Sequence, residues 1–217
     1  MNSIRAIVFD LDGTLIDGYE AIHDALSHAM STLGFTPPTF EETRLMVGHG
    51  LESLMEENVG KDLAAKGVEL FRDYYPEVAL KKTKLFPGVK KLLPQLKKQG
   101  YELSVASNKP EVYSKMILGA NDVLSFFADV LGPDGSYPPK PNPAMIFSLM
   151  KAMGSGTADT VWVGDMEVDV QFARNAGCRV IVVPGGSRDS AFLRTAGADL
   201  MIENLSKLPD ALISLKG

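Results

Sequence analysis

Two aspartates placed two positions apart, Asp10 and Asp12, are the first residues of this chain whose types and spacing could do chemistry. They follow a short apolar run. Gly13 and Thr14 come next and favour a turn, because glycine tolerates a positive φ and a hydroxyl can bond the turning backbone. The N–H groups of such a turn can face an anion while the two carboxylates face a cation. Taken alone, the same residues are also explained by an ordinary turn at a strand end, because so short a motif often matches by chance.

Three further stretches carry polar side chains after an apolar run. Ser107 and Asn108 end the first, Lys140 follows the second through a proline-rich loop, and Asp165 with Asp169 ends the third. Each stretch has a structural explanation of its own: a helix cap, a solvated lysine, and acids favoured at a helix N-terminus. The fold must therefore decide whether they meet the two N-terminal aspartates.

From residue 85 onward the chain alternates apolar runs with helical periods, which predicts parallel strands joined by helices. Strands are expected at 102–107, 129–132, 160–164, 179–183 and 200–202. The apolar run 4–9 must join them, because alone it cannot bury its two faces. The predicted fold class is α/β, a doubly wound parallel sheet. Ligands bind outside the carboxyl ends of the strands in such a sheet, so all four polar stretches are expected at one edge.

Residues 18–82 differ from the rest, because apolar residues recur there at spacings of three and four and no convincing strand is present. Thr39 and Glu42 predict a capping box at the start of one of these helices. We therefore expect a small all-helical cap domain at 18–82, inserted after the first strand. The α/β core domain would then consist of 1–17 and 83–217.

The passages between core and cap are also marked in the sequence. Asp17 lies where the chain leaves the core, and we expect it to serve as a hinge residue rather than a catalytic one. Phe86-Pro87-Gly88 predicts a turn at the return to the core. Pro94 is expected to interrupt the helix that follows this turn.

Four acids and one lysine would lie side by side if the polar stretches meet. Carboxylates at close range repel one another unless a cation sits among them, so a hard, oxygen-preferring metal ion is implied. Mg²⁺ keeps several waters and is completed by substrate phosphate, which suits a site that also has an anion-holding turn. The chemistry that needs all of these groups is phosphoryl transfer.

The composition argues against several other classes of protein. The 217 residues are 45% hydrophobic and 23% charged, as in an ordinary globular enzyme, and a net charge of −5 offers no attraction for nucleic acid. No apolar run is long enough to span a bilayer, and a single cysteine, Cys178, excludes an intrachain disulfide. We expect a cytoplasmic protein with no nucleic-acid or membrane partner, either a monomer or a homodimer.

Four motifs in order carry a family resemblance: D-x-D-G-T-L-x-D at 10–17, S-N-K at 107–109, K-P-x-P at 140–143 and G-D-x-x-x-D at 164–169. Together they resemble the motifs of the haloacid dehalogenase superfamily in its phosphatase branch. The helical insertion resembles the four-helix cap of the phosphoglycolate phosphatase and β-phosphoglucomutase group within that superfamily. The conjunction of motifs is far more specific than any one of them.

The resemblance implies roles for three catalytic residues. Asp10 would be the nucleophile that forms an aspartyl-phosphate. Asp12 would be the acid and base that protonates the leaving oxygen and then activates water. Lys140 would neutralise the charge that develops on the phosphoryl oxygens.

The resemblance also implies the binding groups. The phosphoryl oxygens would be held by Gly13, Thr14, Ser107 and Asn108. Mg²⁺ would be held by Asp10, the backbone carbonyl of Asp12, and Asp165, with Asp169 as a ligand or a partner of the ligands.

The cap would close over the site and contact the leaving group. Gly48-His49-Gly50 is the loop that we expect to contact it, and His49 is therefore a candidate substrate-binding residue. The alternative for this loop is a flexible turn between helices that carries an exposed histidine.

The function expected from this resemblance is a Mg²⁺-dependent phosphatase that acts on a small phosphorylated metabolite, with 2-phosphoglycolate as the best single guess. A sugar phosphomutase of the β-phosphoglucomutase type shares the core residues and differs in whether sugar or water attacks the aspartyl-phosphate. A non-catalytic metabolite-binding protein on the same fold is a further alternative, because fold alone does not fix function.

Overall fold

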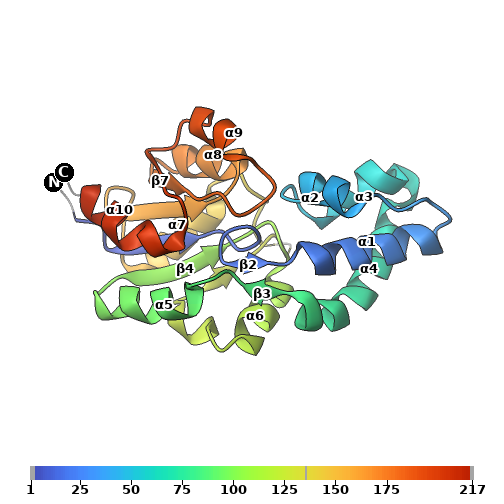
Figure 1. Cartoon of the computed structure of the whole chain (residues 1–217), viewed down its shortest axis with the longest axis horizontal. Helices are drawn as coiled ribbons and strands as arrows, with labels where there is room; N and C mark the ends of the chain where they lie inside the picture. The colour runs from blue at the N-terminus through green and yellow to red at the C-terminus, as the bar shows by residue number, and fades with distance from the viewer. Residues whose placement is uncertain (1–2, 135, 216–217) are drawn as a thin grey trace.

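The computed structural model describes residues 3–134 and 136–215 of the chain. A six-stranded sheet with helices on both faces forms one part of the molecule, and a group of helices projects from one end of it (Figure 1). All neighbouring strands of this sheet are parallel, in the order β5-β4-β1-β6-β7-β8. The strands are β1 (Ala6–Phe9), β4 (Glu102–Ala106), β5 (Val130–Leu131), β6 (Thr160–Gly164), β7 (Arg179–Val182) and β8 (Leu200–Met201).

The two faces of the sheet are buried by different helices. In β1, Ile7 and Phe9 belong to the apolar cluster that includes side chains of α5, α6 and α10, whereas Ala6 and Val8 belong to the cluster with α7, α8 and α9. This alternation is the period-two pattern of a strand buried on both faces. The predicted doubly wound α/β fold is confirmed. The helices are α5 (Val89–Lys98), α6 (Glu111–Ala120), α7 (Ala144–Met153), α8 (Glu167–Asn175), α9 (Ser190–Thr195) and α10 (Leu208–Ser214), with short 3₁₀ turns at Leu124–Phe126 and Leu205–Lys207.

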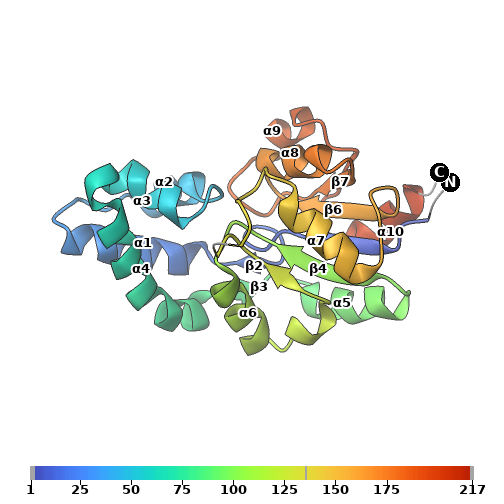
Figure 2. The same ribbon diagram turned by 180° about the vertical axis from the view of Figure 1, so that it is seen from behind.

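The projecting helices follow one another between the first and the second strand of the large sheet. They are α1 (Tyr19–Thr32), α2 (Phe40–Met46), α3 (Leu51–Val59) and α4 (Lys61–Lys82). From behind, the same group lies apart from the layers of the sheet (Figure 2). The predicted capping box is present at α2, where the side chains of Thr39 and Glu42 each bond the other residue's backbone N–H. The exact division of the chain into domains at 18–82 stays a prediction.

A short antiparallel ribbon joins the two parts. It pairs β2 (Ile16–Asp17) with β3 (Lys84–Leu85), and Phe86 donates a further backbone hydrogen bond of 2.9 Å to Leu15. The sequence analysis located Asp17 and the turn after Leu85 as crossing points but did not predict that they pair. Both passages of the chain therefore run side by side.

Pro94 does not interrupt its helix, so that prediction was wrong. It lies inside α5, which continues to Lys98. Pro94 cannot bond the carbonyl of Lys90, but both residues are exposed, so water can satisfy that carbonyl. Among the residues that the structure describes, no helix combines the length and apolarity that a membrane span requires.

The order of the strands fixes where chemistry can occur. The chain adds β4 and β5 on one side of β1, then crosses to the other side and adds β6, β7 and β8. The crevice at such a reversal is the usual ligand site of an open α/β sheet. The residues that follow β1 and β6 lie there.

Candidate active site

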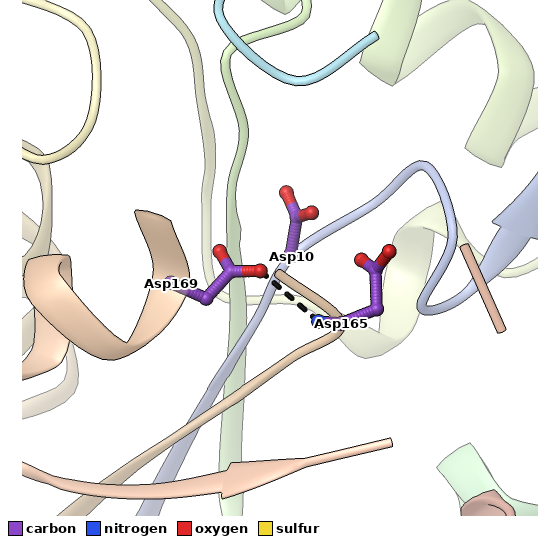
Figure 3. Close-up of side chains that lie close together, drawn as sticks. All are labelled: Asp10, Asp165 and Asp169. Carbon is purple, nitrogen blue, oxygen red and sulfur yellow. Dashed lines mark hydrogen bonds between the residues drawn. The ribbon is translucent and has the colours of Figure 1, made fainter. Parts of the chain in front are cut away.

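Three buried aspartates meet at the carboxyl edge of the sheet (Figure 3). Asp10 follows β1, Asp165 follows β6, and Asp169 lies in the first turn of α8. Each offers one carboxylate oxygen, and these oxygens lie within 4.8 Å of one another. The fold thus brings together two stretches of sequence that the sequence analysis could only place at the same edge.

Lys140 supplies the positive charge within this cluster. Its Nζ donates to Oδ1 of Asp10 at 2.7 Å and to Oδ1 of Asp169 at 2.8 Å, and it lies 5.1 Å from the centre of the Trp162 ring. Burial by itself would lower the pKa of Lys140, but the charges of Asp10 and Asp169 raise it overall. Lys140 is therefore a charged ammonium fixed between two carboxylates.

Asp169 is held by both of its oxygens. While Oδ1 accepts from Lys140, Oδ2 accepts from the backbone N–H groups of Asp165 and Met166 at 3.0 Å each. The pKa of Asp169 is raised to about 6, chiefly because the carboxyl is buried; the charge of Lys140 opposes the shift and the charge of Asp10 adds to it. Both oxygens of Asp169 therefore have partners, and through them Asp169 fixes the positions of the Lys140 ammonium and of the backbone at Asp165 and Met166.

Asp165 has one oxygen with no partner. Oδ1 accepts a hydrogen bond of 3.0 Å from the Thr14 hydroxyl, whereas Oδ2 is buried and has no hydrogen-bond partner among the described residues. Burial, and then the charges of Asp10 and Asp169, raise the pKa of Asp165 well above its usual value. A side chain at Gly186 would collide with Oδ2, so glycine is required for the loop after β7 to approach this closely.

This donor set fits a magnesium ion. The unpartnered Oδ2 of Asp165 and the neighbouring oxygens of Asp10 and Asp169 are hard, anionic ligands of the kind that Mg²⁺ prefers. A divalent cation would also offset the burial of the Asp165 charge and its repulsion by Asp10 and Asp169, which together raise the pKa of Asp165.

Asp12 is paired with a lysine for which the sequence analysis predicted no role. Nζ of Lys109 lies 2.8 Å from Oδ2 of Asp12, and the two side chains are only 6% and 10% exposed. The other oxygen of Asp12 is buried without a hydrogen-bond partner among the described residues. Lys109 stands in the S-N-K motif, so its position was a usable signal, but nothing local in the sequence indicates its partner.

Ser107 and Asn108 are buried at the end of β4 and line the same cavity. The Ser107 hydroxyl accepts from the backbone N–H of Lys109 at 3.2 Å. The Asn108 side chain accepts from the N–H of Lys140 at 2.7 Å and donates to the carbonyl of Gly48 at 2.9 Å. Asn108 therefore ties the lysine loop to the cap.

Gly13 and Thr14 are placed next to Asp165, not along the cavity. The N–H of Gly13 donates to Ile16, the N–H of Thr14 donates to Leu11, and the Thr14 hydroxyl donates to Asp165. Their assignment as phosphate-binding groups stays a prediction. In this arrangement they support the acidic cluster.

A cavity lies between the cap helices and the carboxyl edge of the sheet. Gly48 and Gly50 line it, but the side chain of His49 is exposed and is not part of the lining. The structure thus brings the predicted loop to the site without bringing His49 into it. From the core the lining includes Asp10, Asp12, Ser107, Asn108, Lys109 and Lys140, and from the cap it includes Tyr19, Ile22, Leu51, Leu54, Phe71 and Tyr75.

Two arginines connect the cap to the loop after β7, and the sequence analysis did not anticipate them. Arg44 of α2 donates to the carbonyl of Gly186 at 2.9 Å and lies over the Tyr19 ring at 5.5 Å. Arg188 donates to the carbonyl of Leu45 and forms an ion pair of 2.9 Å with Glu167. These contacts reach backbone carbonyls, for which sequence patterns give no signal.

Comparison with known proteins decides the family. The model of a family described as haloacid dehalogenase-like hydrolases matches residues 7–183, which include all four motifs. The chain belongs to this family. The resemblance seen in the sequence is therefore confirmed.

Individual relatives of the same family agree over nearly the whole length. A phosphoglycolate phosphatase of Vibrio parahaemolyticus is 32% identical over 215 residues, which cover 94% of each protein. A phosphoglycolate phosphatase of Caulobacter vibrioides is 34% identical and covers 96% of this chain and 91% of its own. The crystal structure of a predicted phosphoglycolate phosphatase from Haemophilus somnus matches with a TM-score of 0.91 at 26% identity, covering 97% and 99% of the two chains.

These similarities confirm the expected enzyme class, a phosphatase among the haloacid dehalogenase-like hydrolases. The region matched by the family model also contains the four charged residues that meet at the edge of the sheet, which are Asp10, Lys140, Asp165 and Asp169.

Proposed function

We propose that this chain is a Mg²⁺-dependent phosphatase that hydrolyses a small phosphorylated metabolite, with 2-phosphoglycolate as its substrate, through an aspartyl-phosphate. The observation that carries the proposal is the meeting of Asp10, Asp165 and Asp169 with Lys140 at the strand-order reversal of the sheet. The names of the relatives support the choice of substrate.

In the first step an oxygen of Asp10 attacks phosphorus, and the bond from phosphorus to the bridging ester oxygen breaks. Oδ1 of Asp10 accepts from Lys140, so Oδ2 is the oxygen left to attack. Asp12 donates a proton to the leaving oxygen, which departs as an alcohol.

In the second step Asp12, now a carboxylate, removes a proton from a water molecule, whose oxygen attacks phosphorus. The bond between phosphorus and Asp10 breaks, and inorganic phosphate is released with Asp10 restored. Lys140 lies against the nucleophile in both steps, where its ammonium offsets negative charge on the phosphoryl oxygens.

Asp10 and Asp165, with the backbone carbonyl of Asp12, would hold Mg²⁺, and Asp169 would orient Lys140 and the backbone of Asp165. When bound, the metal ion would supply charge stabilisation to the phosphoryl oxygens. Ser107 and Asn108, which also line the cavity, would contact those oxygens. The cap loop at 48–50 would help to exclude water around the leaving group.

The test is phosphate release from a panel of phosphate esters, with and without Mg²⁺, ranked by kcat/KM. We expect 2-phosphoglycolate to rank first, turnover to require Mg²⁺, and Asp10→Asn to abolish turnover while leaving the circular dichroism spectrum intact. Activity that survives in Asp10→Asn would show that the nucleophile is wrong. Transfer of phosphate to a second hydroxyl of a sugar phosphate, without release, would show a phosphomutase instead.

A further inference from the structure

Lys109 is a buried ammonium that the two proposed chemical steps do not use. Its side chain is only 6% exposed, and its Nζ contacts Asp12 at 2.8 Å. Among the described residues, Lys140 is the other cation that lines the cavity, and its ammonium is ion-paired with Asp10 and Asp169. Lys109 is therefore the positive charge left on the leaving-group side of the site.

Besides Asp12, Lys109 lies beside an aromatic ring with a buried hydroxyl and near apolar side chains of the cap. Its Nζ lies 4.9 Å from the centre of the Tyr75 ring, and the Tyr75 hydroxyl is buried with no hydrogen-bond partner among the described residues. Leu51, Leu54 and Phe71 line the same cavity. A buried ammonium beside an unpartnered hydroxyl can receive a small anion, because the hydroxyl has no partner among the described residues and the ammonium carries more donors than its bond to Asp12 uses.

The position of Lys109 limits where that anion can be. For Asp12 to protonate the bridging oxygen, this oxygen must come within hydrogen-bond distance of Asp12. Since Nζ of Lys109 is 2.8 Å from Oδ2 of Asp12, the ammonium lies on the order of 6 Å or less from a bridging oxygen that bonds Oδ2. An anion attached one carbon beyond the bridging oxygen is within reach of the flexible lysine side chain.

We propose that Lys109 and the Tyr75 hydroxyl bind a carboxylate on the leaving group and thereby select phosphate esters of small hydroxy acids over those of neutral alcohols. This inference rests on the proposed phosphatase function and assigns its specificity to two residues. On binding, Lys109 exchanges Asp12 for the substrate carboxylate. The exchange leaves Oδ2 of Asp12 free to face the bridging oxygen.

The first test compares two substrates of nearly equal size, 2-phosphoglycolate and 2-hydroxyethyl phosphate, which differ in a carboxylate against a neutral hydroxyl. In the wild-type enzyme we expect kcat/KM to favour the carboxylate about 10- to 100-fold, the range for a hydrogen-bonded charged group. In Lys109→Met the ratio collapses toward one. Tyr75→Phe keeps the ring that packs on Lys109 and lowers the ratio by a smaller factor.

Lys115→Met is the matched control. Lys115 lies on the following helix, pairs with Glu111 on the surface and is absent from the cavity lining, so its loss leaves the ratio unchanged. If Lys109→Met lowers both kcat/KM values by the same factor, Lys109 serves only to hold the structure and the proposal is overturned.

A second test needs no variant and guards against misfolding of Lys109→Met. Inhibition of the wild-type enzyme by 3-phosphonopropionate is compared with inhibition by 3-hydroxypropylphosphonate, which lacks the carboxylate. We expect the first to bind at least about tenfold more tightly, and equal inhibition constants overturn the proposal. Absence of Asp10-dependent turnover on every ester would overturn the phosphatase function itself, whereas turnover without discrimination would overturn only the role of Lys109 and Tyr75.

Discussion

Lys140 and Asp10 form an ion pair of 2.7 Å in which the side chains are only 2% and 8% exposed. The same ammonium also contacts Asp169. A pair buried to this degree has little water to replace a missing partner, so the cost of removing one member exceeds that of a surface pair.

Lys140→Met is therefore expected to lower the free energy of unfolding by about 3–5 kcal/mol in the absence of Mg²⁺, because Asp10 and Asp169 remain buried without their cation. Urea unfolding followed by circular dichroism measures the change. The exposed Lys81, paired with Glu77, provides a control, and Lys81→Met should cost less than about 1 kcal/mol. Equal costs for the two variants would contradict a buried, cation-dependent cluster.

Binding of Mg²⁺ to the acidic cluster should raise the free energy of unfolding. Mg²⁺ at about a hundred times its Kd is expected to add about 2.7 kcal/mol to the unfolding free energy of the wild-type enzyme, since the folded chain alone presents the acidic cluster. Asp165→Asn removes the negative charge of the carboxylate that carries the unpartnered Oδ2, and the variant should lose most of this gain. Thermal unfolding with and without Mg²⁺ measures both, and an identical gain in the two proteins would place the ion elsewhere.

Cys178 gives a pH dependence that is separate from the active site. Burial, helped by the charge of Asp159, raises the pKa of the Cys178 thiol from its ordinary 9.0 to about 12. Above pH 9 the Cys178 thiol therefore ionises in the unfolded chain but stays protonated in the folded chain. The contribution of the buried thiol to the free energy of unfolding is therefore fully present below pH 9 and is lost as the pH rises toward 12.

The measurement compares the wild-type enzyme with Cys178→Ala. The difference between their unfolding free energies should be constant from pH 7 to 8.5 and should shift against the wild type by pH 10.5. Native protein should also resist a thiol reagent at pH 8 and react fully in urea, because the thiol is buried and protonated. Rapid labelling of the native chain at pH 8 would be inconsistent with this environment.

The contact between Arg44 and the carbonyl of Gly186 should hold the cap over the site. The Arg44 side chain is 33% exposed, so we expect Arg44→Ala to cost about 1 kcal/mol of the closed arrangement, or about fivefold in KM. Faster amide exchange in α2 would accompany the change. Arg72, which pairs with Glu52 on the surface of the cap, is the control. If Arg72→Ala has the same effect as Arg44→Ala, the Gly186 contact does not link cap and core.

The fold and the acidic cluster were accessible from sequence for a physical reason. Buried parallel strands are apolar runs, and their carboxyl ends meet at one edge, so polar residues after each run were bound to converge. Asp10, Asp165 and Lys140 follow that rule. Even the capping box at Thr39 is a local pattern that needs no knowledge of the tertiary structure.

What the sequence could not reveal depends on partners from distant segments or on the backbone alone. The strands β2 and β3 have two residues each, too short for any periodicity, and they exist because their backbones pair. Lys109 was visible as a motif residue, but Lys109, Asp12 and Tyr75 belong to three separate parts of the chain, so their contacts could not be foreseen. The interruption expected at Pro94 failed because its helix keeps an exposed face there.

The ribbon formed by β2 and β3 also has a consequence for how such a protein can change over evolution. Because the chain leaves the sheet at Asp17 and returns at Lys84, directly opposite, the two ends of the intervening segment lie about 5 Å apart. A segment whose ends adjoin can be replaced by another of different length without altering the order of the strands. The helices that line one side of the cavity are thus attached to the core through two adjacent strands, and their exchange would change the cavity wall without changing the strands that Asp10 and Asp165 follow.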